Sequence, residues 1–264
     1  MAFRARLFND IMMQPNKSFW IWFSPRTGST LLCKALEETG VCGKAGEFFA
    51  EESKSLLAQC DATNYSELRK YIWKKGMSEN GVLGVKHSAY SHRFLSLSEE
   101  LKHERNMLDA HELDWDLWAD IFPNCTHIYL TRRNKIRQAV SWWKAIQDEQ
   151  WHLEKGSISN IDTSFYQDKY NIDALSHLLK ECFLREAMTE SFFEHNQLSP
   201  YVVVYEDLIR NYDGVLKGVY QKMDIEASNE NRNKPFEKTA NQINDEWVDR
   251  FRSDIQKGWD RIMW

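Results

Sequence analysis

Residues 24–30 (Ser-Pro-Arg-Thr-Gly-Ser-Thr) have the composition of a loop that binds an anion. They lie between a short apolar run and a segment with helical periodicity, where Gly28 would let the backbone approach a ligand closely. The free N–H groups at the start of the following helix would point at that ligand. The segment is therefore a candidate phosphate-binding loop, although Ser29 and Thr30 taken alone are also ordinary helix-capping residues.

The loop departs from the G-x-x-x-x-G-K-[ST] pattern of nucleoside triphosphatases. The first glycine of that pattern is missing, and the nearest cation is Arg26, two residues before Gly28. A P-loop-type kinase, which would need magnesium and a nucleoside triphosphate, is therefore the less favoured alternative. A nucleotide-binding module without turnover is a second alternative.

A second basic segment follows a later apolar run. Arg133 leaves the end of a predicted strand, and Ser141 follows eight residues later, about two turns along the next predicted helix. Both side chains could contact one phosphate. The segment from Thr131 to Gln147 contains basic residues and no acidic one, in a chain whose formal net charge is −5. This contrast indicates a local anion site. For Lys135 and Lys144, a solvated basic face of the helix is the simpler interpretation.

The elements that would position these residues alternate along the chain. Apolar runs typical of buried strands occur at residues 19–23, 81–85, 127–130 and 201–205. Helical spacing follows from Ser29, and further helices are predicted over residues 113–122, 134–150 and 172–196. The pattern predicts an α/β fold, a P-loop-like parallel sheet flanked by helices.

Parallel sheets bind ligands beyond the carboxyl ends of their strands. We therefore expect the residues that follow the four predicted strands to meet at one edge of the sheet; they are residues 25–30, 86–87, 132–133 and 205–207.

Composition narrows the class of protein further. The chain has 264 residues, 42% of them apolar and 28% charged, which is typical of a globular protein. With 34 Lys and Arg against 39 Asp and Glu, no global positive field would recruit nucleic acid. No apolar run is long enough to cross a membrane, and five scattered cysteines suggest reduced thiols. We expect one domain over residues 1–264, a cytoplasmic location, and a lid or loop over residues 148–170.

At these motifs the sequence resembles the sulfotransferases that use 3′-phosphoadenosine 5′-phosphosulfate (PAPS), and specifically the bacterial trehalose 2-sulfotransferase family. Three further segments carry the resemblance: residues 43–49 (Gly-Lys-Ala-Gly-Glu-Phe-Phe), residues 137–147 and residues 246–252. The resemblance implies a sulfotransferase fold. It also implies that Arg26, Thr27, Gly28, Ser29 and Thr30 hold the 5′-phosphosulfate and that Arg133 and Ser141 hold the 3′-phosphate.

The resemblance assigns further roles. It makes Glu47 the catalytic base, although a surface Glu beginning a helix would look the same. Lys86 would contact the sulfuryl group, with His87 as a weaker catalytic candidate because the family spacing differs. Tyr205 would contact adenine, and Lys238 would belong to a C-terminal nucleotide clamp, together with Trp247, Arg250 and Arg252.

The implied reaction moves a sulfuryl group from PAPS to a carbohydrate hydroxyl and releases adenosine 3′,5′-bisphosphate, without a metal ion. The acceptor would be trehalose or a glycolipid or lipopolysaccharide sugar. Aromatic residues after the second basic segment could form a platform for that sugar; they are Trp142, Trp143, Trp151 and His152. The resemblance also implies a homodimer.

Overall fold

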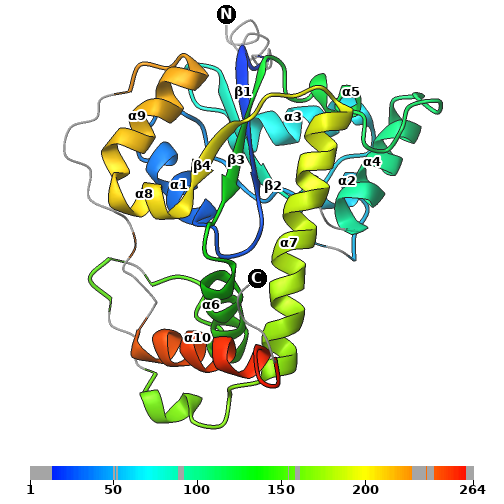
Figure 1. Ribbon diagram of the computed structural model, residues 1–264. Coiled ribbons are helices and arrows are strands. Elements are labelled where there is room, and N and C mark those ends of the chain that lie inside the picture. Colours follow the sequence, from blue (N-terminus) through cyan, green and yellow to red (C-terminus); the bar gives the residue numbers. More distant parts are fainter. Residues whose placement is uncertain are drawn as a thin grey trace, which may run out of the picture.

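A parallel four-stranded sheet forms the centre of the protein (Figure 1). The computed structural model describes residues 14–49, 51, 53–88, 92–153, 155–157, 161–227, 236 and 241–259. The strands pair in the order β2-β1-β3-β4. Their bounds are β1 Lys17–Phe23, β2 Val82–His87, β3 Cys125–Thr131 and β4 Tyr201–Val204. The predicted α/β fold with a helix-flanked parallel sheet is confirmed.

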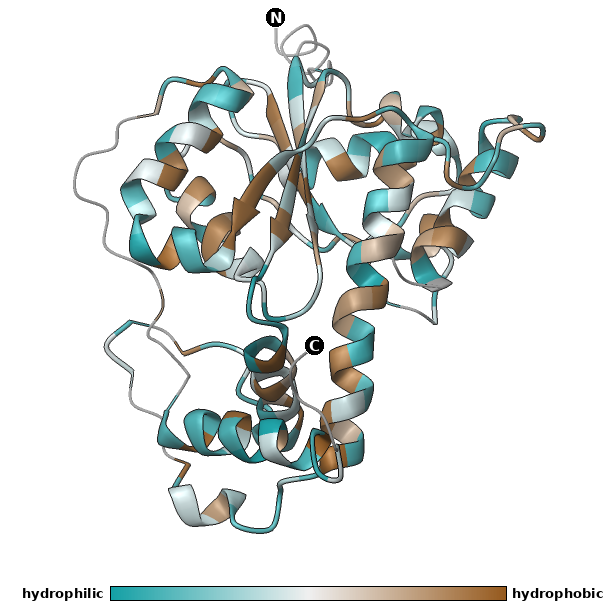
Figure 2. Cartoon of the chain, in the orientation of Figure 1, coloured by the Kyte–Doolittle hydropathy of each residue, from teal (hydrophilic) through white to brown (hydrophobic). Residues whose placement is uncertain are grey.

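Side chains of the central strand β1 alternate between the two faces of the sheet, as the period of two in a strand requires. Phe19 and Ile21 pack in one apolar cluster, whereas Trp20 and Trp22 pack in another. All four side chains are fully buried, so β1 is covered on both faces. Figure 2 shows the hydrophobic residues that run along the strands.

Three helices cover the face that carries Phe19 and Ile21. Their bounds are α1 Ser29–Glu37, α8 Tyr205–Arg210 and α9 Tyr212–Met223. Leucine and valine side chains from these helices complete the cluster, with Leu32, Leu208 and Val219 fully buried. The helix α1 begins directly after the β1–α1 loop (residues 24–28). Packing on this face therefore fixes the position of the α1 N-terminus relative to the loop.

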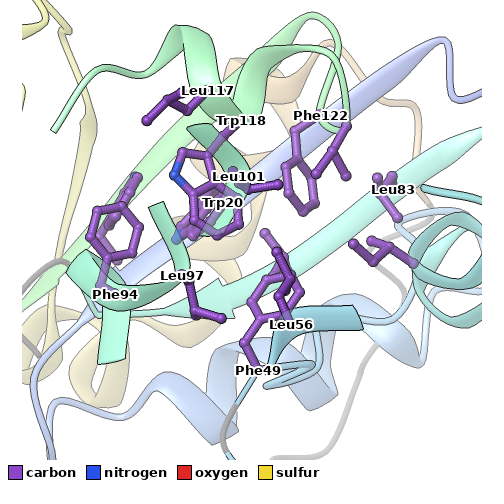
Figure 3. Packing of buried hydrophobic residues seen from close by; sticks show 14 of the residues in the cluster. Trp20, Phe49, Leu56, Leu83, Phe94, Leu97, Leu101, Leu117, Trp118 and Phe122 are labelled. Atoms are coloured by element: carbon purple, nitrogen blue, oxygen red, sulfur yellow. The ribbon is translucent and has the colours of Figure 1, made fainter. Parts of the chain in front are cut away.

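The other face is covered by shorter helices and by the end of a long one; their bounds are α2 Leu56–Gln59, α3 Tyr65–Gly76, α4 His92–Glu104, α5 Asp116–Ala119 and α7 Ile172–His195. Aromatic rings and leucines make up this core, and Figure 3 shows Trp20 next to Trp118. Trp20 stacks on Trp22 at a centroid distance of 4.7 Å and meets Trp118 edge-on at 5.2 Å. Much of the tryptophan in the sequence therefore fills the core rather than a ligand site.

One buried polar pair crosses this aromatic core. The indole N–H of Trp22 donates to Nδ1 of His127 at 3.0 Å. Burial lowers the pKa of His127 to about 4, so the ring is neutral near pH 7 and its Nδ1 is free to accept this bond.

A smaller apolar cluster lies beyond the carboxyl ends of the strands (Figure 1). It joins α6 (Lys135–Asp148), the 3-10 helix η1 (Thr163–Tyr166), the first half of α7 and α10 (Gln242–Ile255). Trp247 and Phe251 of α10 are buried within it. The cluster holds α6 against the sheet edge at which the site residues were expected.

Several predicted bounds differ from the structure by one or two residues, and β2 extends through Lys86 and His87, which were expected to follow it. Two further differences concern residues 113–122 and 201–205. The helix expected over residues 113–122 shortens to α5 (Asp116–Ala119), because the Asp114 carboxylate accepts a hydrogen bond from the His111 N–H and forms a turn instead. The strand expected over residues 201–205 ends at Val204, and Tyr205 opens α8. No helix in the described part of the chain is long and apolar enough to cross a membrane.

Gly84 in the middle of β2 allows a second segment to run beside the sheet. The Lys86 N–H donates to the Gly46 carbonyl at 3.0 Å, which places Glu47 at the end of β2. A Cβ on Gly84 would lie 2.5 Å from the Phe19 ring and 3.1 Å from the Ala45 backbone nitrogen. Only glycine therefore fits where this segment crosses the strand.

We expect Gly84→Ala to destabilise the protein by about 1–3 kcal/mol, because the added methyl group overpacks the core against Phe19 and backbone. Urea denaturation followed by circular dichroism measures the change. An unchanged unfolding midpoint would contradict the close approach described above.

Candidate active site

The β1–α1 loop turns sharply between β1 and α1. Arg26 has φ 66° and Gly28 has φ 87°, both in the left-handed region. Thr27 is fully buried, and its hydroxyl donates to the Ser24 carbonyl at 2.8 Å. The turn leaves the N-terminus of α1, with Ser29 and Thr30 as its first residues, at the carboxyl end of the sheet. Free N–H groups in this position favour an anion.

The helix α6 braces the loop through side chains. Gln138 is fully buried and donates from Nε2 to the Ser24 hydroxyl at 2.8 Å and to the Pro25 carbonyl at 2.9 Å. One turn further, Ser141 Oγ accepts from Arg26 Nε at 3.0 Å. The second basic segment therefore contacts the first motif directly, as the strand-end argument predicts.

Arg132 and Tyr205 close the other side of the loop. Arg132 donates from Nη1 to the Arg26 carbonyl at 3.2 Å, and its guanidinium lies 4.5 Å from the centroid of the Tyr205 ring. The same ring lies so close to Gly28 that a Cβ there would be 2.8 Å from Tyr205 Cδ2. Gly28 is therefore required both by its backbone conformation and by this aromatic neighbour.

Positive charge concentrates at the loop. Burial lowers the pKa of Arg26, and the neighbouring Arg132 lowers it further. Burial also lowers the pKa of Arg132. Both guanidiniums remain charged, since arginine titrates far above neutrality. Two partly desolvated cations side by side provide a favourable environment for an incoming anion.

Lys86 and Glu47 form an ion pair beside the loop. Lys86 Nζ lies 2.6 Å from Glu47 Oε1, and it also donates to the Thr30 hydroxyl at 3.3 Å. The Lys86 side chain is only 10% exposed, whereas the Glu47 side chain is 43% exposed. A solvent-accessible carboxylate is thus tethered next to the helix that begins at the anion loop. This arrangement brings Glu47, Lys86 and Thr30 together as the sequence led us to expect.

His87 is not part of this group. Successive residues of a strand point to opposite faces, so Lys86 faces the loop while the His87 ring lies among Trp20, Phe49 and Phe94. Burial lowers the pKa of His87, and its Nδ1 lies 3.0 Å from the Ser88 carbonyl. The structure assigns His87 to the aromatic core, away from the residues expected to do chemistry.

Arg133 and Ser141, expected to share one phosphate, have different partners here. The Arg133 guanidinium makes two hydrogen bonds to the Asp207 carboxylate, at 2.8 and 2.5 Å. Its backbone N–H and that of Asn134 donate to the Glu206 carboxylate at the N-terminus of α6. Carboxylates therefore occupy positions that a phosphate could take, and an incoming 3′-phosphate would compete with Asp207 for Arg133.

The predicted aromatic platform divides between core and surface. Trp142 is buried against Arg185, and the Trp143 indole donates to the Lys169 carbonyl. Only Trp151 and His152 reach the loop: the Trp151 carbonyl accepts from Arg26 Nη1 at 2.6 Å, and His152 Nε2 lies 3.2 Å from Thr30 Oγ1.

The predicted nucleotide clamp gains no support from the described residues. Lys238 lies outside them. Trp247 belongs to the apolar cluster under α6, Arg250 stacks on the Tyr170 ring at 3.8 Å, and Arg252 pairs with Asp249.

Sequence reasoning did not identify Gln138 or Asp148 as site residues. Asp148 is buried, bonded by Lys144 Nζ and the Tyr166 hydroxyl at 2.7 Å each, and it accepts from the Gln150 N–H. It thereby fixes the turn that delivers Trp151 to Arg26. The sequence around an amide or carboxylate on an amphipathic helix does not indicate that it supports a neighbouring loop. The packing of α6 beneath the loop shows these contacts.

One group among the described residues has the composition of a metal site: His111, Asp114 and His195, whose ligand atoms lie within 4.8 Å of one another. His195 ends α7 just before β4, at the amino end of the sheet and far from the loop. His111 Nδ1 accepts from the Leu113 N–H, so the neutral ring carries its proton on Nε2. A metal ion at Nε2 would have to displace that proton, so this tautomer is not the metal-binding one.

Comparisons with known sequences match this chain to sulfotransferases. The sequence profile described as Stf0 sulphotransferase matches residues 18–254. The chain is 26% identical over 269 residues to the trehalose 2-sulfotransferase of Mycolicibacterium smegmatis, covering 91% of this chain and 96% of that protein. It is 24% identical over 274 residues to the trehalose 2-sulfotransferase of Mycobacterium tuberculosis, covering 93% and 98%.

Among solved structures, a sulfotransferase from Alicyclobacillus acidocaldarius superposes with a TM-score of 0.45 at 13% identity, over 92% of this chain and 93% of that one. The profile match runs from β1 to α10 and includes the loop, the Lys86–Glu47 pair and α6. The chain therefore belongs to the Stf0 sulphotransferase family.

Proposed function

We propose that this protein transfers a sulfuryl group from PAPS to a carbohydrate hydroxyl and releases adenosine 3′,5′-bisphosphate. The observation that carries the proposal is the position of Glu47: a partly exposed carboxylate, held by Lys86 at 2.6 Å, beside the anion loop. Membership of a sulfotransferase family supplies the reaction class.

The β1–α1 loop fits the 5′ end of the donor. The N-terminus of α1 presents the N–H groups of residues 28–30, and Gly28 has no side chain to block their approach. Arg26 contributes charge from within the loop. Together these groups would bind the phosphosulfate and stabilise the negative charge that grows on the leaving phosphate.

The 3′-phosphate is proposed to lie at the start of α6. Arg133 and the N–H groups that now bond Glu206 are the donors there, and Ser141 lies two turns along the same helix. Tyr205, stacked between Arg132 and Gly28, is the proposed adenine contact. Lys238 remains a proposal from family resemblance alone.

Glu47 is proposed as the general base. A neutral hydroxyl is a weak nucleophile near pH 7, so a positioned group must take its proton as the new S–O bond forms. Glu47 accepts that proton, while the Lys86 ammonium keeps the carboxylate in place and faces the transferring group. Sulfuryl transfer brings less negative charge to the reacting centre than phosphoryl transfer does, so the proposed chemistry requires no metal ion.

Trehalose is the acceptor that we propose first. Both curated relatives are named trehalose 2-sulfotransferase, and each is covered almost in full by this chain. Trp151, 42% exposed beside the loop, offers an aromatic face to a sugar ring. A glycolipid or lipopolysaccharide sugar would use the same face, because similarity on the donor side says little about the acceptor.

We make three further proposals, of which only the first rests on family resemblance; the other two rest on the apolar and polar pattern of the sequence. They are a homodimer, a cytoplasmic location, and a lid over residues 148–170 that covers the acceptor.

We expect mass spectrometry to detect an added sulfate on trehalose after incubation with the protein and PAPS, and to detect it equally when EDTA is present. The reaction panel includes a glycolipid and a lipopolysaccharide sugar, and a parallel arm with ATP and magnesium. Phosphate transfer from ATP would support the kinase alternative. PAPS binding without any sulfated product would support the nucleotide-binding module without turnover.

We expect adenosine 3′,5′-bisphosphate to bind at least about tenfold more tightly than AMP, because a charge-assisted contact is worth about 1.5–3 kcal/mol. Arg133→Ala should remove this preference. Asp207→Asn is the matched control, since it releases Arg133 from its present partner and should retain or widen the preference. Equal affinities for the two nucleotides in calorimetry would contradict the 3′-phosphate assignment.

We expect Glu47→Gln to lower the rate of sulfuryl transfer by about 10²–10⁴ and to leave nucleotide affinity nearly unchanged, because only the proton acceptor is lost. Glu51→Gln, four residues away on the surface, should retain full turnover. Single-turnover kinetics measure both. The base assignment would be wrong if Glu47→Gln kept near-full turnover while His87→Ala, which should mainly weaken the core, abolished it.

A further inference from the structure

His152 lies beside the N-terminus of α1, where the β1–α1 loop ends. It follows the turn that Asp148 fixes at the end of α6, and its neighbour Trp151 is tied to Arg26. Its Nε2 lies 3.2 Å from the Thr30 hydroxyl. Thr30 accepts a hydrogen bond from Lys86 and keeps its own proton to donate to His152. The contact is therefore well suited to a neutral imidazole.

The charges that face His152 come from three different segments. Arg26 in the loop and Lys86 on β2 are positive, and Glu47 is negative. The Phe236 ring, at a centroid distance of 5.5 Å from His152, carries no charge. Partial burial lowers the pKa of His152, Arg26 and Lys86 lower it further, and Glu47 opposes them. In the free protein desolvation and the two cations therefore both favour the neutral imidazole, although His152 remains exposed to solvent.

An anion bound at the loop reverses this balance. A phosphate or phosphosulfate at the N-terminus of α1 would offset the charges of Arg26 and Lys86 and would itself favour a positive imidazole. Thr30 connects the two sites, because it is both a first-turn residue of α1 and the hydrogen-bond partner of His152. Few side chains other than histidine can respond in this way near neutral pH.

We propose that His152 is a proton-coupled part of the donor site: it takes up a proton when an anion binds the β1–α1 loop, and it then acts as a third cation beside Arg26 and Lys86. The proton comes from solvent or buffer and returns there when the nucleotide leaves. The inference rests on the proposed nucleotide site and adds a residue to it that family resemblance did not assign.

The coupling has a definite sign. The bound protein would hold the proton more tightly than the free protein, so nucleotide affinity is greatest at low pH. Affinity is lost as pH rises through the window between the free and bound pKa values, by at most about tenfold per pH unit for one proton. The lower edge of this window lies below the ordinary histidine value of about 6.5, because the free value is depressed.

Isothermal titration calorimetry with adenosine 3′,5′-bisphosphate tests the proposal. Titrations near pH 7 in buffers of different ionisation enthalpy give the number of protons taken up on binding. We expect the wild type to take up more protons than His152→Gln, by about half a proton, and expect its affinity to fall more steeply with rising pH. Titration of the nucleotide phosphates contributes to both proteins and cancels in the difference.

His177→Gln is the matched control, because His177 is exposed on α7 away from the loop and should bind protons as the wild type does. Equal proton uptake by wild type and His152→Gln, with intact nucleotide binding, would overturn the role of His152 and leave the proposed function standing. Failure of the wild type to bind the nucleotide would overturn the donor site itself and the proton coupling with it.

Discussion

The site depends on the side-chain hydrogen bonds between α6 and the β1–α1 loop. Arg26 holds a left-handed conformation, which costs a non-glycine residue about 1–3 kcal/mol. Gln138 and Ser141, one turn apart on α6, bond the loop at Ser24, Pro25 and Arg26. The strained turn is thus stabilised by a helix rather than by its own backbone. The small apolar cluster under α6 therefore serves the site, since it keeps that helix in place.

Neighbouring residues acquire opposite roles through strand geometry. Lys86 and His87 differ by one position on β2, and the pleat directs the first to the anion loop and the second into the aromatic core. The approach of Glu47 depends on the same strand, because the Gly46 carbonyl bonds the Lys86 N–H. A shift of one residue in this register would replace the lysine beside the loop with a buried ring.

Local patterns predicted the strands, the long helices and the convergence of the loop with α6, because these follow from apolar periodicity and from the common direction of parallel strands. Glu47 and the role of Lys86 came from the family resemblance, whereas the strand-end argument placed Lys86 and Thr30 at the same end of the sheet. Local patterns did not predict which groups these side chains contact. Whether Arg133 bonds a phosphate or Asp207, and whether a tryptophan such as Trp142 fills the core or meets a sugar, depends on contacts between segments distant in sequence.

Each pairing of a site cation with a carboxylate has a consequence for binding. Lys86 pairs with Glu47 at 2.6 Å and Arg133 with Asp207 at 2.5 Å, whereas Arg26 bonds the neutral oxygens of Ser141 and Trp151. A bisphosphate that reached Arg133 would have to displace the Asp207 carboxylate, which offsets part of the charge interaction gained there. At Arg26 it would meet a cation whose charge burial has made costly. The 5′ end of the nucleotide should therefore contribute most of the affinity, and the 3′ end most of the selectivity.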